Sequence, residues 1–240
     1  MKPSISVLGA GSWGTALVIT LAQKGYNIRI WDLNEEHLRS MDEHRENKKY
    51  LSGVKLPDNI KIEFSVENVI YEPDIIVLSV PSQGVRNALN KIRSLVPKGC
   101  IIVNTGKGIE KESLMTISQL VKEELPDNPF VVLSGPSHAE EVSKGMPTTL
   151  VSASDSKEAA EYIQDLFMSS VLRVYTNPDV IGVELGGALK NIIALAAGIS
   201  DGLGFGDNAK AALITRGIVE ISRLGVAMGA CPSTFSGLSG

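Results

Sequence analysis

Cysteine and aromatic residues are scarce in this sequence. Its 240 residues include 2 cysteines, and aromatic residues make up 5% of the chain. Cys100 lies in a segment with the pattern of a buried strand, and Cys231 stands just before Pro232, so neither belongs to a cluster with the spacing of metal ligands. We therefore expect no disulfide framework and no metal site, and a reducing compartment such as the cytoplasm fits best.

A dominant charge and a long apolar run are also missing. The formal net charge is −4, which gives no general electrostatic reason to bind nucleic acid or an anionic membrane. The longest apolar stretches, such as residues 192–199, are far shorter than a membrane span. The first four residues lead directly into a strand pattern, with no room for a signal peptide. The sequence therefore predicts a soluble intracellular protein with no membrane span.

What the sequence does contain is the composition of an ordinary globular protein, with 43% hydrophobic and 21% charged residues. Over residues 1–178, short strands rich in β-branched residues alternate with helices, which is typical of a doubly wound, largely parallel α/β sheet. Residues 179–240 contain long helices without strands and predict the start of a second, all-helical domain. The chain stops in a glycine-rich turn after a long helical pattern, so we expect this domain to be truncated.

The expected elements follow from apolar periodicity and turn residues. Strands are expected at residues 5–8, 27–31, 74–80, 100–105, 130–134, 148–153 and 172–175. Helices are expected at residues 15–24, 35–45, 84–95, 111–124, 157–167, 180–200 and 208–228. Asn34 and Asp155 precede two of these helices and are expected to cap them. The polar stretch 46–61 is expected to be an irregular loop.

A glycine-rich turn follows the first expected strand. Residues 9–14 read Gly-Ala-Gly-Ser-Trp-Gly and lead into an apolar helix. Gly9 permits a tight turn, Gly11 lets the backbone approach a pyrophosphate, and Gly14 lets the helix pack close to the strand. Asp32 ends the second expected strand, where a carboxylate can accept hydrogen bonds from the ribose hydroxyls of an adenosine. The pattern predicts a Rossmann-like dinucleotide site; the alternative is a turn that serves packing alone.

Lys190 is the strongest candidate for a catalytic residue. It is the only cation in the apolar helix expected at residues 180–200, which we expect to be buried nearly all round. Burial and nearby positive charge lower the pKa of an amine toward neutrality, where it can exchange a proton. Alternatively, Lys190 reaches the surface or pairs with a carboxylate such as Glu184. Asn191 beside it can orient a substrate or satisfy backbone groups.

Two further segments stand at expected strand ends, where ligands bind in sheets of this kind. Lys107 lies between two glycines, so the backbone can turn sharply and direct the side chain into the crevice, although a loop lysine is usually only solvated. Residues 134–141 read Ser-Gly-Pro-Ser-His-Ala-Glu-Glu and turn from a strand end into a helix start, which suits an anion or a hydroxyl group. The alternative is a plain helix cap, because Ser137 and Glu140 have the spacing of a capping box.

The three histidines are not expected to be catalytic. His138 is expected to begin the helix after residue 137. His37 and His44 lie on a polar helix and are expected to be solvated.

These motifs occur with others in a fixed order. Gly-Ala-Gly-Ser-Trp-Gly-Thr-Ala-Leu from residue 9, Gly-Lys-Gly-Ile-Glu at 106–110, the 134–141 segment and Arg-Val-Tyr-Thr-Asn-Pro-Asp at 173–179 come first. Gly-Gly-Ala-Leu-Lys-Asn-Ile-Ile-Ala at 186–194, Gly-Leu-Gly-Phe-Gly-Asp-Asn at 202–208 and Ala-Ala-Leu-Ile-Thr-Arg-Gly at 211–217 follow. Over essentially the whole chain, this series resembles the NAD(P)-dependent glycerol-3-phosphate dehydrogenases of the bacterial type.

The resemblance implies reversible hydride transfer between a nicotinamide and the second carbon of sn-glycerol 3-phosphate. In the direction of reduction, this reaction supplies glycerol 3-phosphate for phospholipid synthesis. It implies Lys190 as the residue that accepts or donates the proton. The implied substrate-binding residues are Lys107, Gly135, Ser137, Lys190 and Asn191. The implied cofactor-binding residues are Gly9, Gly11, Ser12, Trp13, Gly14, Asp32, Lys107 and Ala139.

The sequence departs from the family's pattern in two places. The family commonly has a basic residue after the second strand that suits the 2′-phosphate of NADP, whereas this chain has Asp32-Leu33-Asn34. We therefore expect a preference for NAD, with NADP possible. The family also continues past residue 240 with an aspartate and a Ser-Arg-Asn triplet that grips the substrate phosphate. Because neither is present here, we expect a chain that binds cofactor and turns over poorly or not at all.

Two other functions remain open on the residues alone. A β-hydroxyacid dehydrogenase shares the dinucleotide domain, the helical second domain and a lysine base, and it would prefer an unphosphorylated acid. A non-catalytic nucleotide-sensing module would bind cofactor with no activity to lose. The helices after residue 179 carry much apolar surface, which either more chain or a partner subunit normally covers. We therefore also expect self-association, most simply as a homodimer.

Overall fold

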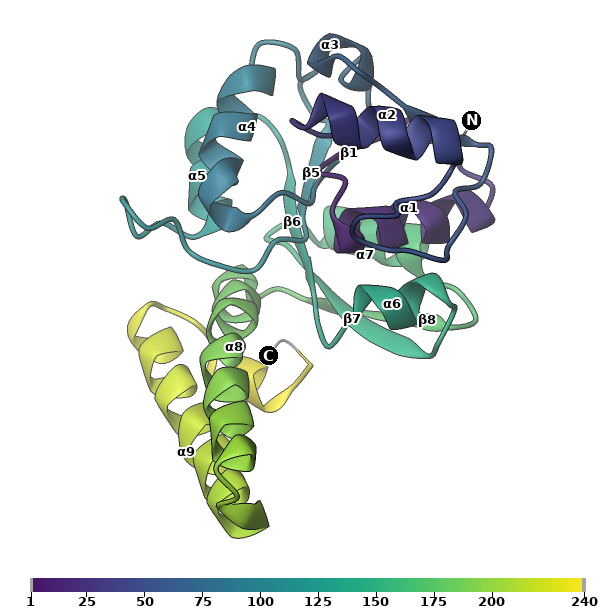
Figure 1. The fold of residues 1–240 in the computed structure, drawn as a ribbon. Helices are drawn as coiled ribbons and strands as arrows, with labels where there is room; N and C mark the ends of the chain where they lie inside the picture. The colour runs from purple at the N-terminus through teal and green to yellow at the C-terminus, as the bar shows by residue number, and fades with distance from the viewer. Residues whose placement is uncertain (1, 239–240) are drawn as a thin grey trace.

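The computed structural model describes residues 2–238, in which one sheet carries helices on both faces and a helical hairpin extends from one end (Figure 1). Strands β1 (Ile5–Leu8) and β4 (Ile75–Leu78) consist mainly of β-branched and aliphatic residues and are buried at all four positions. This burial is expected for strands whose two faces are both covered. Helices α4 and α5 lie on one side of the sheet, and α1 and α7 lie on the other (Figure 1).

The remaining elements have the following bounds. The other strands are β2 (Ile28–Trp31), β3 (Ile60–Ile62), β5 (Ile101–Asn104), β6 (Phe130–Ser134), β7 (Thr148–Ala153) and β8 (Leu172–Asn177). The helices are α1 (Ser12–Gln23), α2 (Glu35–His44), α3 (Val66–Val69), α4 (Val85–Ile92), α5 (Ile117–Glu124), α6 (Ala139–Ser143), α7 (Lys157–Phe167), α8 (Val180–Gly202) and α9 (Gly206–Ala227). Two 3₁₀ turns, η1 (Ser82–Gly84) and η2 (Pro232–Ser236), complete the set.

The strand order is β3-β2-β1-β4-β5-β6-β7-β8. The chain moves outward from β1 through β2 to β3, returns to the other side of β1 at β4, and then continues outward. All neighbouring pairs are parallel except β6 and β7, which are antiparallel. The predicted doubly wound, largely parallel sheet is therefore confirmed, with one antiparallel junction. The strand order reverses between β1 and β4, and ligands bind in such sheets at the carboxyl ends of the strands beside that reversal.

Several local expectations are corrected by the structure. Asn34 caps α2 as predicted, but α7 is capped by Ser156, whose side chain accepts from the Ala159 amide, and not by Asp155. Helix α5 begins at Ile117 because Thr116 forms a capping box with Gln119, so the expected helix 111–124 starts six residues late. Strand β3 and helix α3 were not predicted, since three or four residues carry too little periodicity to identify.

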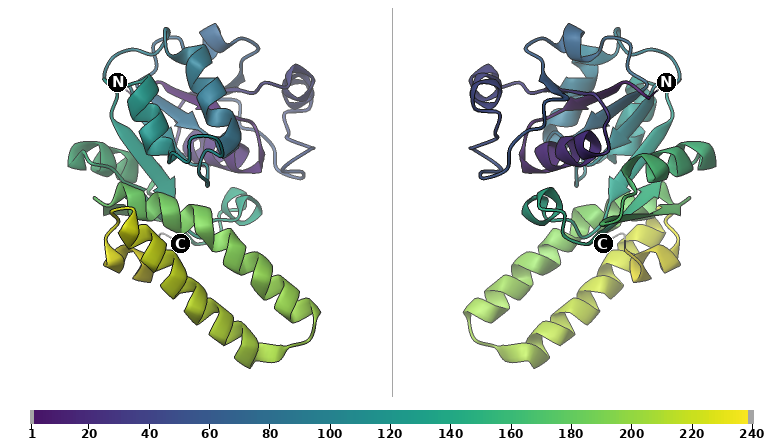
Figure 2. Two further views of the ribbon diagram at one scale, coloured as in Figure 1. Left: turned by 90° about the vertical axis from the view of Figure 1, so that its left-hand side faces the viewer. Right: turned by 90° about the vertical axis from the view of Figure 1, so that its right-hand side faces the viewer.

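The helical hairpin is the second structural unit of the described chain. Helices α8 and α9 run antiparallel and project away from the sheet (Figure 2). They approach closely because Gly217 has no side chain: a Cβ there would lie 2.5 Å from Cδ1 of Ile193. The prediction that helix 180–200 is buried nearly all round is wrong. Residues 182–187 are buried against the sheet, whereas Ile192, Leu195 and Ile199 are exposed, because only α9 and η2 cover that part of α8 among the described residues.

Helix α8 also bears on the expectation that the chain has no membrane span. By length and composition alone, its 23 residues are apolar enough to cross a membrane, which the shorter stretch 192–199 did not suggest. A core helix of a soluble protein passes the same test, and the first turns of α8 are buried under β6 and β7. The absence of a span therefore stays a prediction.

Candidate active site

The glycine-rich turn lies where the strand order reverses. Gly9 has φ +106°, and a Cβ on it would lie 2.5 Å from the Ser79 carbonyl oxygen at the end of β4. A Cβ on Gly14 would collide with the Gly9 carbonyl oxygen. Gly11, the N-cap of α1, is different: a Cβ there would meet no protein atom within 4 Å. Gly9 and Gly14 are therefore required by packing, whereas Gly11 borders open space at the N-terminus of α1.

Asp32 fixes the shape of this turn from the end of β2. One carboxylate oxygen accepts a hydrogen bond of 2.8 Å from the Ala10 amide, and the other accepts one of 3.0 Å from the Asn34 amide. Asp32 is partly buried and lines the same cleft as Gly11. The carboxylate thus lies beside the glycine-rich turn, where the sequence predicts contact with a ribose.

The polar loop between α2 and β3, here called the 46–55 loop, belongs to the site. Its part in the site was not predicted from the sequence. Asn47 is fully buried and donates to the Ala10 carbonyl oxygen at 2.9 Å and to Thr15 Oγ1 at 2.7 Å. Its own side-chain oxygen accepts from the Tyr50 amide at 3.0 Å. This loop is thereby tied to the glycine-rich turn, and Tyr50 lines the cleft beside Asp32.

The side chains of His37 and Lys49 both pack against the ring of Tyr50. His37 packs edge-on against its ring, with the ring centroids 5.0 Å apart, and His37 Nε2 lies 3.0 Å from the Ala10 carbonyl oxygen. The expectation that His37 is solvated is wrong, since it is buried under the 46–55 loop. Lys49 Nζ lies 4.9 Å from the centroid of the Tyr50 ring. Contact with Tyr50, and then the charges of Asp32 and Glu36, raise the pKa of Lys49.

These elements enclose a cleft of about 550 Å³. Its floor is the turn after β1 and its walls are the segments after β4 and β5. The amides of the first turn of α1 and the open space at Gly11 suit a pyrophosphate, and Asp32 suits a ribose. The described residues therefore fit a dinucleotide. The lining residues are Gly9, Gly11, Ser12, Trp13, Asp32, Tyr50, Ser79, Val80, Pro81, Thr105, Gly106, Lys107 and Ser137.

Lys107 enters this cleft from the loop after β5. Its Nζ donates to the Gly135 carbonyl oxygen at 3.1 Å. Burial, and then the positive charge of Lys190, lower the pKa of the Lys107 amine to about 8. A lysine of this kind is still largely protonated at pH 7 and can give up its proton readily.

Lys190 reaches the same region from α8. The helix approaches the end of β6 at Gly187, where a Cβ would lie 2.8 Å from Ser134 Oγ and 3.6 Å from Lys107 Cγ. Lys190 is half-buried and lines a groove between α8, α9 and η2 together with Phe235. It does not pair with Glu184, whose carboxylate accepts from the amide and hydroxyl of Ser118. The two lysines therefore approach each other from the sheet and the hairpin, near enough for the charge of Lys190 to lower the pKa of Lys107.

The 134–141 segment lies between them. Gly135 has φ +146°, and a Cβ on it would lie 2.8 Å from the Thr149 carbonyl oxygen, so only glycine fits. Ser137 Oγ donates to the Gly135 carbonyl oxygen at 3.2 Å. His138 is the N-cap of α6 as predicted, but it makes no side-chain cap, and the capping box proposed for Ser137 does not form because α6 starts one residue later. Ala139 is buried at the start of α6.

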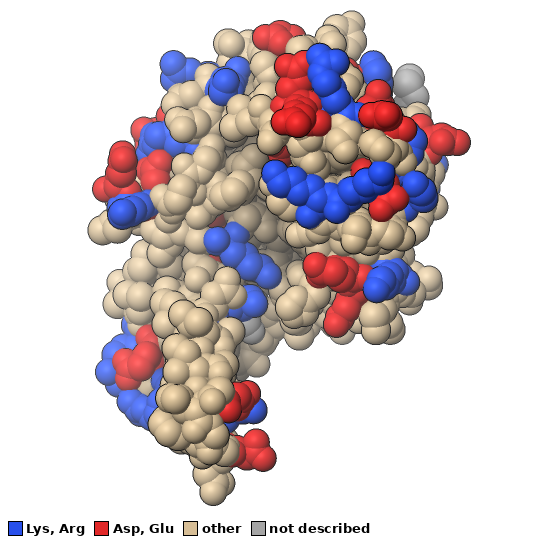
Figure 3. Space-filling model, in the orientation of Figure 1, with Lys and Arg blue, Asp and Glu red and all other residues tan. Residues whose placement is uncertain are grey.

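The predicted site residues lie in three places. Most of the predicted cofactor residues, Lys107 among them, line the cleft together with Ser137. Gly14 and Ala139 lie behind its surface, buried in the first turns of α1 and α6. Asn191 is exposed on α8, next to Lys190 in the sequence. Figure 3 shows Lys and Arg side chains on the walls of the hollow between the sheet and the hairpin.

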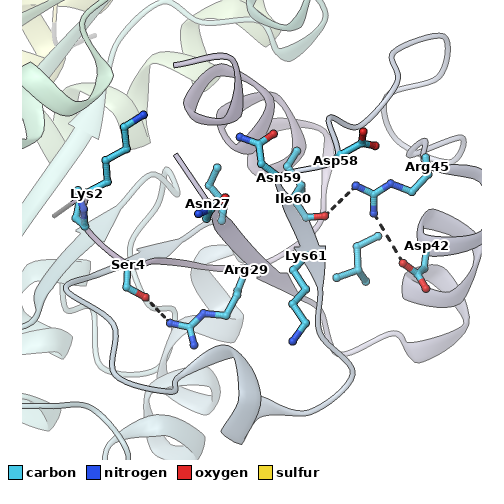
Figure 4. Close-up of a pocket in the computed structure, with 13 residues that line it drawn as sticks. Lys2, Ser4, Asn27, Arg29, Asp42, Arg45, Asp58, Asn59, Ile60 and Lys61 are labelled. Carbon is cyan, nitrogen blue, oxygen red and sulfur yellow. Dashed lines mark hydrogen bonds and ion pairs between the residues drawn. The ribbon is translucent and has the colours of Figure 1, made fainter. Parts of the chain in front are cut away.

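A second cleft, of about 770 Å³, lies at the opposite ends of β1 to β3 (Figure 4). Its basic side chains already have protein partners. Arg29 donates to Ser4 Oγ, Arg45 donates to the Ile60 carbonyl oxygen, and Lys61 pairs with Glu63. Because its cations are occupied in tying the N-terminal segment and α2 to the sheet, this cleft offers less to an anion than the first.

Comparison with known proteins agrees with this geometry. Residues 4–160 match the family described as NAD-dependent glycerol-3-phosphate dehydrogenase N-terminus, and residues 179–240 match its C-terminus. The chain belongs to the NAD-dependent glycerol-3-phosphate dehydrogenase family. The family predicted from the sequence motifs is thereby confirmed.

The relatives of this family member cover nearly all of its chain. Glycerol-3-phosphate dehydrogenase [NAD(P)+] of Desulfitobacterium hafniense is 56% identical over 236 residues, which are 98% of this chain and 67% of the relative. The Moorella thermoacetica enzyme of the same name is 54% identical over 240 residues, 100% of this chain and 71% of its own. The crystal structure of glycerol-3-phosphate dehydrogenase from Coxiella burnetii has a TM-score of 0.96 at 38% identity and covers 100% of this chain and 73% of its own.

More distant structures share the fold alone. The 3-hydroxyisobutyrate dehydrogenase of Mycobacterium tuberculosis has a TM-score of 0.54 at 12% identity over 86% of this chain. This likeness explains why a β-hydroxyacid dehydrogenase was an open alternative, and it carries no information on substrate.

Proposed function

We propose that this protein transfers a hydride between NAD(P)(H) and the second carbon of sn-glycerol 3-phosphate, or of dihydroxyacetone phosphate in the reverse direction. The observation that carries the proposal is the approach of α8, which bears Lys190, to Lys107 at the edge of the cleft formed by the glycine-rich turn. Two ammonium groups at the edge of a nicotinamide site suit a substrate that carries a phosphate and develops charge on a carbinol oxygen. The names of the relatives support the same reaction.

On the cofactor side, the proposed binding residues are those around the glycine-rich turn. Bound NAD(P)H supplies the hydride. Gly11 and the first amides of α1, with Ser12 and Trp13, hold the pyrophosphate. Asp32 receives the ribose hydroxyls, and Gly9, Gly14 and Ala139 keep the turn and α6 close enough for contact.

On the substrate side, the lysines have different tasks. Lys190 donates a proton to the oxygen of the carbonyl carbon as that carbon is reduced, and it accepts the proton in the reverse reaction. Such general acid–base help is worth about 10² to 10⁴ in rate. Lys107, Gly135 and Ser137 bind the substrate from the β5 and β6 ends, and Asn191 orients it from α8. The low pKa of Lys107, about 8, reflects the burial that a water-poor site requires.

Further parts of the proposal concern the cofactor and the setting. We propose NAD(H) as the preferred cofactor, because the Asp32 carboxylate repels a 2′-phosphate at the ribose.

Residues 1–178 form the dinucleotide-binding unit and residues 179–240 begin the substrate unit, since β8 ends at Asn177 and α8 begins at Val180. The protein works in the cytoplasm as a homodimer and supplies glycerol 3-phosphate for phospholipid synthesis.

The test is oxidation of NADH, and separately of NADPH, by the 240-residue chain supplied with dihydroxyacetone phosphate. We expect the 240-residue chain to turn over NADH poorly, and we expect Lys190→Ala to lower that turnover by a further factor of about 10² or more. Lys122→Ala is the matched control, because Lys122 is exposed on α5 and outside the cleft.

Two further measurements separate the alternatives: turnover of other substrates, and NADH binding followed by fluorescence. Turnover of an unphosphorylated hydroxyacid in place of glycerol 3-phosphate would favour the β-hydroxyacid dehydrogenase. Absence of turnover that a longer form of the chain restores would mark the 240-residue chain as truncated. Unchanged NADH binding by both variants, with no turnover even by a longer form, would favour a nucleotide-sensing module.

A further inference from the structure

The loop of residues 106–111, here called the Lys107 loop, connects β5 to α5 and is fixed by hydrogen bonds and an ion pair from the segment after β4. It follows β5 and carries Lys107 into the cleft. An isolated bridge between Ile109 and Thr116 closes its far side just before α5. The question is what fixes Lys107 at a position where burial lowers its pKa.

The backbone of the loop is clamped by η1, the 3₁₀ turn that follows β4. Gln83 Nε2 donates to the Ile109 carbonyl oxygen at 2.8 Å, and Gln83 Oε1 accepts from the Lys111 amide at 3.0 Å. Gly108, at φ +147°, lies so close to Ser82 that any Cβ would collide with the serine side chain. The loop therefore follows the surface of η1 with no space between them.

The ion pair between Arg86 and Glu110, three residues after Gln83 and one residue after Ile109, completes the clamp. Arg86 of α4 donates to both carboxylate oxygens of Glu110, from Nε at 2.8 Å and from Nη2 at 2.9 Å. Ser113 Oγ also donates to Glu110. Hydrogen bonds from Arg86 and then Ser113 lower the pKa of Glu110 to about 2, so the pair is charged at neutral pH. The two-pronged geometry fixes the orientation of the pair as well as its distance.

Neither member of this pair lines the cofactor cleft or the groove of Lys190. The side chains are 28% and 11% exposed, and Arg86 Nη1 also contacts Glu123 and Glu124 at the end of α5. Arg86 thus joins α4, the Lys107 loop and α5. Arg86 therefore acts on the chemistry only indirectly, and the shortest connection runs through Glu110 to Lys107, three residues earlier in the same loop.

We propose that Arg86 and Glu110 are positioning residues that hold Lys107 in the cleft, with Gln83 fixing the backbone between them. The kinetic part of this inference rests on the proposed function, and the chemical-labelling part does not. A 1 Å displacement of a positioned group can cost about 10²-fold in rate, so the clamp has consequences for catalysis although it touches no reactant.

The kinetic test compares Arg86→Gln with Arg93→Gln. Arg93 is the matched control, because it also pairs with Glu124 but makes no contact with Glu110. We expect Arg86→Gln to lower kcat/KM for dihydroxyacetone phosphate by about 10- to 100-fold, with NADH affinity unchanged within about twofold. Arg86→Lys, which keeps the charge and one prong, is expected to recover part of the loss. Equal kinetics in Arg86→Gln and wild type would overturn the proposal.

The labelling test needs no activity. Acetic anhydride modifies deprotonated amines, and mass spectrometry of peptides follows the reaction of Lys107 as a function of pH. In wild type we expect a midpoint near pH 8, and Lys111 in the same loop, which is exposed, serves as the internal reference. In Arg86→Gln we expect the Lys107 midpoint to rise by about one unit as the amine gains solvent.

The two tests separate the failures. If wild type binds NADH but turns over no phosphorylated substrate, the proposed function fails, and the labelling midpoint alone decides the clamp. If Arg86→Gln does not fold by circular dichroism, Glu110→Gln and Arg86→Lys replace it in both tests. An unshifted Lys107 midpoint in a folded variant of Arg86 or Glu110 shows that the pair only stabilises the fold and overturns the inference.

Discussion

At the scale of the residue, two glycines three positions apart in the turn after β1 meet opposite surroundings. A Cβ on Gly14 collides with the Gly9 carbonyl oxygen, whereas a Cβ on Gly11 meets nothing within 4 Å. We expect Gly14→Ala to lower the free energy of unfolding by about 1–3 kcal/mol, the usual cost of overpacking. Gly11→Ala is expected to leave stability unchanged and to weaken NADH binding at least about tenfold, because the methyl group occupies space at the helix N-terminus. Thermal denaturation and NADH titration measure the two effects.

The contrast between these variants is itself the control. If the glycine-rich turn serves packing alone and the space beside Gly11 holds no cofactor, Gly11→Ala will bind NADH as wild type does. That result would remove the glycine-rich turn from the cofactor site.

Two side chains of opposite charge lie near the expected ribose position. Asp32 lines the cleft and disfavours a 2′-phosphate. Lys49, next to Tyr50 and near enough for the charge of Asp32 to raise its pKa, favours one. We expect Asp32→Asn to bring the affinities for NADPH and NADH closer together and Lys49→Gln to drive them apart, each by about 3- to 10-fold. Parallel titrations of both cofactors measure the ratio. Comparable affinities for NADH and NADPH in wild type would contradict the proposed preference.

At the scale of the element, a buried carboxylate ties α8 to the start of α5. Glu184 accepts from the Ser118 amide at 2.8 Å and from its hydroxyl, and burial raises the pKa of this carboxyl group. In the pH interval between the lower unfolded pKa and the raised folded pKa, the folded state binds more protons. The contribution of Glu184 to stability is therefore fully present below the unfolded pKa and is lost as the pH rises through the folded pKa.

Glu184→Gln tests this linkage. A glutamine can accept from the Ser118 amide and donate to its hydroxyl, so the contact survives while the charge is removed. We expect the variant to be more stable than wild type at pH 7–8 and equal to it near pH 4, with each pKa unit worth about 1.4 kcal/mol. Thermal denaturation across this range measures the difference, and a constant offset at all pH values would contradict it.

The elements that the sequence predicts best are those encoded by adjacent residues. Strands β6 and β7 and helix α7 have the predicted bounds, because alternation, periodicity and polar caps all act within a few residues. The glycine-rich turn was predictable for the same reason. The family motifs predicted the meeting of Lys107 and Lys190, which lie 83 positions apart and which periodicity alone cannot bring together.

Contacts between distant segments were beyond the sequence. The loop 46–55 reads as polar and irregular, yet buried Asn47 ties it to Ala10, 37 residues earlier. His37 reads as a solvated residue of a polar helix and is buried by that same loop. Glu184 was a possible partner of Lys190 and instead binds Ser118. A polar side chain finds its partner only when the whole sheet is assembled, so its role cannot be read from its neighbours.

At the scale of the whole molecule, the sheet and the hairpin differ in how they bury apolar surface. The central strands β1 and β4 are buried under helices on both faces, whereas the hairpin leaves Ile192, Leu195 and Phe205 more than 60% exposed. Figure 3 shows one face of the hairpin as an uncharged strip with charged side chains along its two edges. Apolar patches of this kind are rare on monomers and mark surfaces that bind another protein.

We therefore expect the 240-residue chain to self-associate through the hairpin, in line with the proposed homodimer. Leu195→Lys, in the middle of the exposed face of α8, is expected to shift the chain toward monomer by at least about tenfold in dissociation constant, since a buried lysine without a partner opposes docking. Tyr71→Lys is the matched control, because Tyr71 is 67% exposed on the sheet domain and Leu195 is 68% exposed on the hairpin. Sedimentation equilibrium over a range of concentrations measures both. A dimer that dissociates equally in the two variants would place the contact away from the hairpin, and a monomer at every concentration would show that the apolar face remains in water.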